Sequence, residues 1–254
     1  MTVRILVSND DGIHADGITA LAKAMEALGE VWVVAPETEQ SATSHSLSLH
    51  RPLRIREAKP RWFGVDGTPA DSVYLAVNQL MRDAPPTLVV SGVNHGPNLA
   101  DDVIYSGTVA AAMEAVMLGI PAVAFSLSTR KRDEMRFDVA ARFAQSLVRA
   151  LLEKPLEKNL LLNVNVPPGT PTQFAVTRLG RHTYNADVIE KTDPRGKKYY
   201  WVGGTGYEHE SLDGTDCSTV FELGKISISP VKVDMTDHAR LGALGALRLD
   251  GFAP

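Results

Sequence analysis

Short apolar runs alternate with longer segments of helical periodicity through the first two thirds of the chain. The runs are apolar at successive positions, which is typical of strands that are buried on both faces of a parallel sheet; they lie at residues 3–7, 31–35, 87–91, 121–127 and 160–166. Between them, apolar side chains recur at helical spacing over 18–28, 69–81, 109–119 and 135–152. This alternation predicts an α/β fold: a Rossmann-like, mostly parallel sheet with helices on both faces.

The ends of two predicted helices carry clear chemical signals. Gly29 follows the first helix and suits the residue just beyond its C-terminus. Thr68 is followed by a proline and by Asp71 in the first turn, so we expect Thr68 to cap the second helix. Before that helix, residues 52–57 and 61–65 are expected to form a short antiparallel pair of strands.

The pattern changes after residue 168. Strand-like pieces alternate with turns rich in Gly and Asp, and helical signal is scarce; these pieces lie at 173–179, 198–203 and 225–233, and only 238–249 is weakly helical. We therefore divide the chain into a Rossmann-like core, 1–168, and a β-rich antiparallel extension with a C-terminal arm, 169–254. The two form one continuous functional unit. Arms of this kind often pack on another subunit, which predicts a homo-oligomer.

Composition narrows the class of protein. The chain has 254 residues, of which 44% are hydrophobic, so it can bury a large core. We expect no membrane span, since no run of about 18 apolar residues occurs, and no signal peptide is visible. The single cysteine, Cys217, cannot form an internal disulfide and is expected to be structural. These features favour a cytoplasmic protein, and the net charge of −4 and 6% aromatic content argue against binding of a nucleic-acid duplex.

Candidate chemistry begins directly after the first strand, where Asp10 and Asp11 precede Gly12. Open α/β sheets bind their ligands at the carboxyl ends of the strands. Adjacent carboxylates repel each other unless a proton or a cation neutralises them, and hard divalent cations favour such oxygen ligands. The alternative is that one Asp caps the next helix while the other lies in water. A Gly-x-Gly-x-x-Gly motif is missing here, which argues against a dinucleotide-binding fold.

A hydroxyl-rich segment, residues 37–50, follows the second strand and should reach the same edge of the sheet. Ser41, Thr43 and Ser44 could contact a metal or a phosphate, although a solvated loop explains the segment equally well. None of the seven histidines forms a His-x-x-x-His pair, so we do not expect a zinc site.

The longest loop, residues 91–108, is punctuated by Gly, Pro and Asn, and long loops in compact domains are often functional. The amide oxygen of Asn94 suits Mg²⁺ or a similar ion, or else Asn94 merely tolerates an unusual turn. Ser106, Gly107 and Thr108 precede an Ala-rich helix, whose N-terminus can hold a phosphate. Ordinary capping by Thr108 is the alternative, and the two roles can coexist.

Several motifs, taken together and in this order, resemble the survival protein E (SurE) family of nucleotidases. They are SNDDG at Ser8–Gly12, GTPAD at Gly67–Asp71, SGVNHGPN at Ser91–Asn98, YSGTV at Tyr105–Val109, NVNVP at Asn163–Pro167 and GTD at Gly214–Asp216. The match covers nearly the whole chain, and several separate motifs in the right order make chance similarity improbable. One departure is Ala100, where the family usually has glycine.

The resemblance implies a metal-dependent phosphatase that hydrolyses nucleoside 5′- and 3′-monophosphates, and in some members short-chain polyphosphate. It also implies a Rossmann-like core and a homodimer or homotetramer with exchanged C-terminal elements. Carried over residue by residue, the ligands of a divalent cation, Mg²⁺ or Mn²⁺, are Asp10, Asp11, Ser41 and Asn94. Ser41 rests on its place in a less regular loop, with Thr43 and Ser44 as competitors.

From these residues we formulate a hypothesis of phosphoryl transfer to water. The cation would neutralise charge on the phosphate and lower the pKa of a bound water. Groups at Ser106, Gly107 and Thr108, with Asn98 as a further donor, would hold the remaining phosphate oxygens, and Asp10 or Asp11 would orient the attacking water. A covalent aspartyl-phosphate is the chemical alternative and ranks lower, because both acids are wanted as metal ligands. A non-catalytic, metal-dependent nucleotide sensor is the alternative function.

Overall fold

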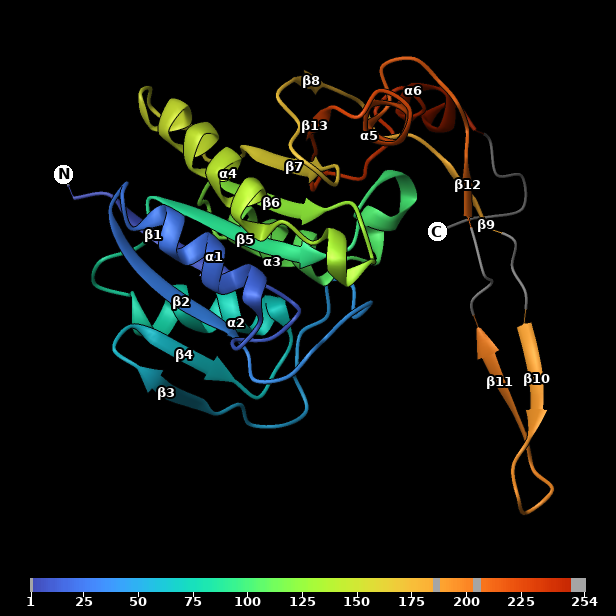
Figure 1. The fold of residues 1–254 in the computed structure, drawn as a ribbon, viewed down its shortest axis with the longest axis horizontal. Coiled ribbons are helices and arrows are strands. Elements are labelled where there is room, and N and C mark those ends of the chain that lie inside the picture. The colour runs from blue at the N-terminus through green and yellow to red at the C-terminus, as the bar shows by residue number, and fades with distance from the viewer. Residues whose placement is uncertain (1, 185–187, 203–206, 248–254) are drawn as a thin grey trace.

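A nine-stranded, mostly parallel sheet forms the centre of the computed structural model, which describes residues 2–184, 188–202 and 207–247 (Figure 1). The strands lie in the order β3-β4-β2-β1-β5-β6-β7-β13-β8. The five predicted core strands are confirmed as β1 (Arg4–Ser8), β2 (Glu30–Pro36), β5 (Leu88–His95), β6 (Ala122–Leu127) and β7 (Leu161–Val166). All their mutual pairings are parallel, so the predicted fold class is confirmed.

The order of strands reverses at β1. The chain passes from β1 to β2 on one side, and β5, β6 and β7 continue on the other side. Loops that leave the carboxyl ends of β1 and β5 therefore diverge, which opens a crevice at this edge of the sheet. Asp10 follows β1 at this point of reversal.

Helices cover both faces of the sheet, and this explains the unbroken apolar runs. Helices α1 (Asp16–Met25) and α4 (Phe137–Leu152) pack on one face, and α2 (Pro69–Leu75) and α3 (Gly107–Met117) pack on the other (Figure 1). In β1, Ile5 and Val7 belong to the first buried cluster, whereas Leu6 belongs to the second. A strand that must be apolar on both sides shows little alternation.

The helix boundaries follow the sequence closely at α2 and less closely at α1. The side chain of Thr68 accepts a hydrogen bond from Asp71 N (3.0 Å), and Asp71 Oδ2 accepts one from Thr68 N (2.9 Å), so the predicted cap is confirmed. A π-helical turn, Ala76–Leu80, extends α2 to the predicted end. Helix α1 begins at Asp16, two residues before the prediction. It ends at Met25 with Glu26 as its C-cap, so the expectation that Gly29 directly follows the helix is wrong; the chain turns back earlier, with Leu28 N bonded to Met25 O (2.8 Å).

Both edges of the sheet contain antiparallel pairs. The predicted pair near residue 60 is confirmed as β3 (Ile55–Lys59) and β4 (Trp62–Val65), and β4 also joins the sheet beside β2. At the other edge, β13 (Ile226–Pro230) runs antiparallel to β7, and β8 (Phe174–Val176) lies parallel to β13. Strands from beyond residue 168 thus complete the main sheet, and the division of the chain at that residue stays a prediction.

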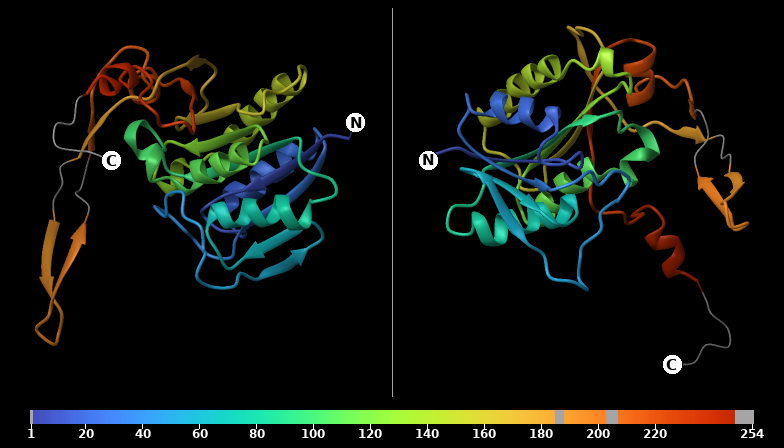
Figure 2. Two further views of the ribbon diagram at one scale, coloured as in Figure 1. Left: turned by 180° about the vertical axis from the view of Figure 1, so that it is seen from behind. Right: turned by 60° about the horizontal axis from the view of Figure 1, so that its bottom comes forward.

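An arm stands away from the sheet, as the antiparallel extension predicted. It consists of the pair β9 (His182–Tyr184) and β12 (Tyr207–His209) and of the hairpin β10 (Val188–Thr192) and β11 (Lys198–Val202), and Figure 2 shows it from two further sides. The two ends of this segment meet at a bridge between Arg178 and Thr215. Strands β9, β10 and β12 were not predicted.

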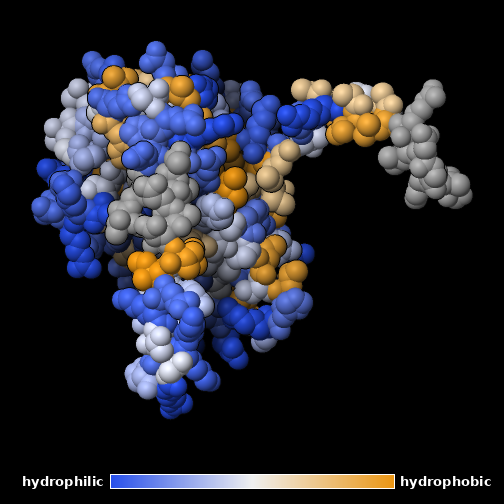
Figure 3. Space-filling model, turned by 90° about the vertical axis from the view of Figure 1, so that its right-hand side faces the viewer, coloured by the Kyte–Doolittle hydropathy of each residue, from blue (hydrophilic) through white to orange (hydrophobic). Residues whose placement is uncertain are grey.

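Two short helices flank the last strand. Helix α5 (Asp216–Phe221), capped by Thr215, was not predicted, since six residues are too few to show periodicity. Helix α6 (Leu241–Gly245) lies within the predicted weakly helical segment, of which residues 248 and 249 fall outside the described part. Apolar side chains are exposed on the hairpin and on the projecting C-terminal segment (Figure 3). Among the described residues, no helix has both the length and the apolar character needed to cross a membrane.

Candidate functional site

Asp10 and Asp11 lie at the carboxyl end of β1 and contact two different elements. Asp10 is buried and accepts a short hydrogen bond from the hydroxyl of Thr108 in α3. Asp11 is partly buried, and its Oδ2 accepts a hydrogen bond from the backbone N–H of His95 (3.2 Å) at the end of β5. The two neighbouring carboxylates therefore bring together β1, β5 and the start of α3.

The environment disfavours negative charge on both carboxylates. Burial raises the pKa of Asp10 to about 6 against the lowering effect of the Thr108 hydrogen bond, and the charge of Asp11 raises it further. Burial likewise raises the pKa of Asp11 to about 6, opposed by the hydrogen bond from His95 and supported by the charge of Glu39. A nearby cation would lower the pKa of both carboxylates again, because it favours their negative charge.

The residues present fit a hard divalent cation. Within the described part of the chain, neither Asp10 nor Asp11 forms an ion pair with a lysine or arginine, and His95, 3.7 Å from Asp11, has a pKa lowered by its own burial. Two buried carboxylates without a basic partner require a proton or a metal. Among the described residues no group of three or more His, Cys, Asp and Glu could hold a metal, so further ligands must be neutral oxygens such as those of Ser41 and Asn94.

Ser41 lies on the loop that follows β2, and this loop crosses the edge of the sheet close to Asp10. The backbone N–H of Gln40 donates to the carbonyl of Asp10 (2.7 Å). The Ser41 hydroxyl donates to Glu39 Oε1 (2.8 Å), and Ser41, Glu39 and Asp11 line one hollow of about 540 Å³. The structure therefore places Ser41 and Asp11 at the same cavity.

The two competing hydroxyls are engaged in holding the loop itself. Thr43 Oγ1 donates to Gln40 O (2.8 Å), and Ser44 Oγ donates to Ile104 O (2.8 Å). Neither residue lines the hollow at Asp11, which favours Ser41 over Thr43 and Ser44 as a metal ligand.

Asn94 lies within a strand, which corrects the expectation that the strand ends at residue 91. Strand β5 continues to His95, and its register against β6 shifts between Ser91 and Asn94. Gly92 allows this path, because a Cβ there would lie 2.1 Å from the carbonyl oxygen of Phe125. Asn94 Nδ2 donates to Gly96 O (2.9 Å), so the amide nitrogen is used locally and the amide oxygen is the atom that a cation would require.

The N-terminus of α3 packs directly on Asp10. Ser106 is the cap, since its hydroxyl accepts a hydrogen bond from Val109 N (3.1 Å), so the alternative of capping by Thr108 is wrong. A Cβ at Gly107 would lie only 2.7 Å from Asp10 Cβ, so glycine is required for this close approach. The predicted phosphate-binding end of the helix thus adjoins Asp10, one of the predicted metal ligands.

Asn98 lies in a separate polar cluster at the ends of β6 and β7. Its Nδ2 donates to Ser126 Oγ (2.8 Å), and its backbone N–H donates to Asn165 Oδ1 (2.9 Å). Its carbonyl accepts hydrogen bonds from the side chains of Asn163 (2.8 Å) and Asn165 (2.9 Å). In the described structure no hydrogen bond joins Asn98 to Asp10 or Asp11, so Asn163 and Asn165, and not the carboxylates, position Asn98.

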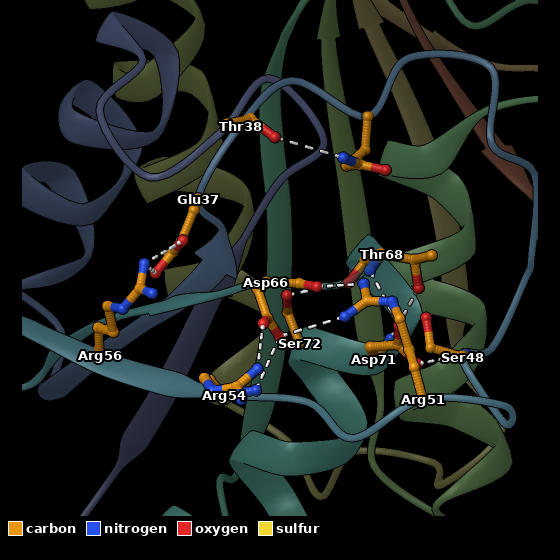
Figure 4. A network of polar contacts seen from close by, with 11 residues as sticks. Glu37, Thr38, Ser48, Arg51, Arg54, Arg56, Asp66, Thr68, Asp71 and Ser72 are labelled. Carbon is orange, nitrogen blue, oxygen red and sulfur yellow. Dashed lines mark hydrogen bonds and ion pairs between the residues drawn. The ribbon is translucent and has the colours of Figure 1, made fainter.

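Four titratable residues of the hollow were missed in the sequence. Glu37, Glu39, His14 and His95 line it together with Asp11 and Ser41. Glu37 is held by Arg56 (2.8 Å), as Figure 4 shows, whereas Glu39 binds Ser41. The signal for His95 was its place beside Asn94, and the signal for Glu39 was its place two residues before Ser41.

Comparison with known proteins gives consistent results over almost the whole chain. Residues 5–186 match the family model described as Survival protein SurE. The chain is similar to the 5′-nucleotidase SurE of Myxococcus xanthus strain DK1622, with 56% identity over 250 residues that cover 98% of this chain and 95% of the relative. It is also similar to the 5′-nucleotidase SurE of Vibrio parahaemolyticus serotype O3:K6, with 47% identity over 245 residues, or 95% and 93% of the two chains.

A solved structure supports the same relationship. The crystal structure of the Sure protein from Aquifex aeolicus superposes with a TM-score of 0.84 at 37% sequence identity. The match covers 95% of this chain and 98% of that chain.

Proposed function

The chain belongs to the Survival protein SurE family, and from this membership we propose that it is a metal-dependent phosphatase that hydrolyses nucleoside 5′-monophosphates to nucleoside and phosphate. The observation that carries the proposal is the direct contact between Asp10 and the first turn of α3, through Gly107 and Thr108. Carboxylates suited to a cation and N–H groups suited to a phosphate then lie side by side.

The residues that would hold the cation, Mg²⁺ or Mn²⁺, are Asp10, Asp11, Ser41 and Asn94. Once bound, such a cation supplies positive charge to the phosphate and lowers the pKa of a water molecule. The protein contributes the placement: Thr108 and His95 fix the two carboxylates by hydrogen bonds. Within that arrangement Asp10 or Asp11 orients the attacking water.

The phosphate would bind at Ser106, Gly107 and Thr108, where the helix dipole and the N–H groups of Gly107 and Thr108 in the first turn favour an anion. Asn98 serves as a further donor, because its amide nitrogen carries two hydrogens and the bond to Ser126 uses one. This site recognises the phosphate and not its point of attachment, so we extend the proposal to 3′-monophosphates and to short-chain polyphosphate.

A phosphate-release assay tests the proposal. Wild-type protein with Mn²⁺ should release phosphate from AMP and GMP, and the Asp10→Asn variant should not. Excess chelator should stop the reaction. Nucleotide binding without phosphate release would instead identify a metal-dependent sensor, and a phosphoaspartate trapped during turnover would identify a covalent mechanism.

We also propose a homodimer or homotetramer assembled through the arm. The hairpin exposes six large apolar or aromatic side chains: Val188, Ile189, Tyr199, Tyr200, Trp201 and Val202. Exposed apolar surface of this kind marks an interaction site. Light scattering should report an oligomer for the wild type and a smaller species when Ile189 and Trp201 are both changed to serine; an unchanged mass would contradict this role of the hairpin.

A further inference from the structure

We infer that His45 and Glu114 form a clamp that positions loop 37–50 against α3 and thereby sets the geometry between the cation ligands and the phosphate-binding turn. They act as positioning residues, without contact to substrate. The inference rests on the proposed function, and its experiment is arranged so that the failure of either one can be recognised separately.

The contact is short, and one of its partners is buried. His45 Nε2 lies 2.7 Å from Glu114 Oε2, and the Glu114 side chain is only 5% exposed. A carboxylate in this position requires a hydrogen-bonding or charged partner. Among the described residues, His45 is the one ion-pair partner of Glu114. The loop therefore supplies the partner of a buried carboxylate on α3.

Glu114 lies on the face of α3 that looks toward the site. It follows Gly107 by seven residues, which is about two helical turns and returns to the same side of the helix. Gly107 on that side packs against Asp10. His45 therefore contacts the same side of the helix, about two turns from the proposed phosphate site.

The remaining contacts of the loop reach other elements. Ser44 bonds to the carbonyls of Ile104 and Tyr105 ahead of α3, Ser46 O accepts from Thr68 Oγ1 (2.7 Å), and Ser48 N donates to Asp71 Oδ1 (2.9 Å) at the start of α2. Figure 4 shows the contact between Ser48 and Asp71. In the described structure, His45 is the loop side chain that reaches the body of α3.

The loop needs such a clamp because two of its residues have an unfavourable backbone conformation. Ala42 and Ser44 have φ values of 57° and 55°, in the left-handed region that residues with a side chain avoid. Conformations of this kind persist only where surrounding contacts enforce them. These two residues lie between Ser41, the proposed metal ligand, and His45, the clamp. Release of His45 would therefore let the segment relax and carry Ser41 away from Asp11.

The test compares three variants with a matched control. His45→Ala removes the clamp, His45→Gln keeps a donor for Glu114, and Glu114→Gln removes the charge. His50→Ala is the control, because His50 is an exposed histidine of the same loop. For each protein we would measure Mn²⁺ affinity of the metal-free form by calorimetry, KM and kcat for AMP, and the thermal midpoint.

We expect His45→Ala to weaken Mn²⁺ binding by about 10-fold or more and to raise KM, as is usual when an outer residue that orients a ligand is lost. His45→Gln should recover most of the affinity, and His50→Ala should match the wild type. In the double variant His45→Ala/Glu114→Gln, the loss should be no larger than in the worse single variant, because both remove one interaction.

A lower thermal midpoint with unchanged Mn²⁺ affinity and KM would show a merely structural pair and would overturn the inference. Additive effects of the two substitutions would overturn it as well. If the wild type releases no phosphate from AMP, the proposed function fails, while the calorimetric comparison still decides whether the clamp controls cation binding.

Discussion

The two sides of the candidate site are built in different ways. On one side, Asp10 is held by α3, with Gly107 against its side chain and Thr108 bonded to its carboxylate. On the other side, Ser41 lies on an irregular, exposed loop whose backbone is left-handed at Ala42. The first side is fixed by regular elements of the fold, and the second depends on individual side-chain contacts. Substitutions on the first side should therefore disturb the packing of α3 against β1, whereas substitutions on the second side should mainly remove single side-chain contacts.

The largest effect is expected at the carboxylates. Asp10→Ala or Asp11→Ala should lower kcat/KM for AMP by about 10³-fold or more, because each removes a proposed charged ligand of the cation, worth roughly 4 kcal/mol to the transition state. The metal-free variants should melt no lower than the wild type, since a buried charge has been removed. Activity within 10-fold of the wild type would contradict the assignment of these residues.

The pH dependence of stability is the next largest effect. The pKa of each carboxylate is about 6 in the folded protein and 3.8 in the unfolded chain, so the folded state binds more protons between these values. The free energy of unfolding of the metal-free protein should therefore fall as pH rises from about 4 to about 6, by on the order of 3 kcal/mol for each group.

Urea unfolding at a series of pH values measures this slope. The double variant Asp10→Asn/Asp11→Asn is the control and should lose most of it. Added Mn²⁺ should raise the free energy of unfolding more at pH 7 than at pH 5, because the cation binds the deprotonated carboxylates. A slope that persists in the double variant would place its origin elsewhere.

Gly107→Ala tests how tightly the regular side is packed. A Cβ would lie 2.7 Å from Asp10 Cβ, so α3 or β1 must shift, at a cost of about 1–3 kcal/mol in unfolding free energy. Activity should fall in parallel, because the phosphate-binding turn moves. Gly242→Ala is the matched control, with open space around its Cβ position. Equal unfolding midpoints for the two variants would contradict the close contact.

Glu39→Gln tests the loop side through a single hydrogen bond. The Ser41 hydroxyl donates to Glu39, which leaves its oxygen lone pairs available to the proposed cation. Loss of the charge should weaken Mn²⁺ binding by about 1 kcal/mol, or roughly five-fold, in calorimetry. Glu37→Gln, whose wild-type carboxylate binds Arg56 instead, should bind Mn²⁺ as the wild type does.

Ala42→Gly should have the smallest effect and the opposite sign. Glycine adopts the φ of 57° without strain, which outweighs its larger entropy in the unfolded chain, so the unfolding free energy should rise by about 0.5 kcal/mol. The same change should reduce the effect of His45→Ala on Mn²⁺ binding. A lower thermal midpoint would show that the loop is not strained at Ala42.

The sequence predicts the regular side of the site better than the irregular one. The strands and helices of the core were predictable because burial on both faces imposes long apolar runs and helical spacing. Asp10 and Asp11 were found because they follow such a run, and Ser106 to Thr108 because they precede a helix. Their direct contact follows from the order of strands, which brings α3 against the end of β1.

The features that escaped prediction depend on contacts between distant segments. Strand β5 extends to Asn94 and His95 because it pairs again with β6 after the register shift at Gly92, although both residues are polar. Helix α5 is too short for a periodic signal, and it is held by Asp216, which accepts hydrogen bonds from Ala100 N (2.9 Å) and Gly180 N (2.7 Å). No local pattern encodes such partners.

The meeting of Arg178 and Thr215 at the base of the arm has a consequence for evolution. Because the chain leaves and re-enters the body of the molecule at one point, the segment between them behaves as an insertion. The length and sequence of its outer part, the hairpin of β10 and β11, can vary without moving the strands on either side, β8 and β13, which are already neighbours in the sheet. A change in the hairpin would thus alter the proposed contact between subunits while the strands that carry the candidate site stay in place.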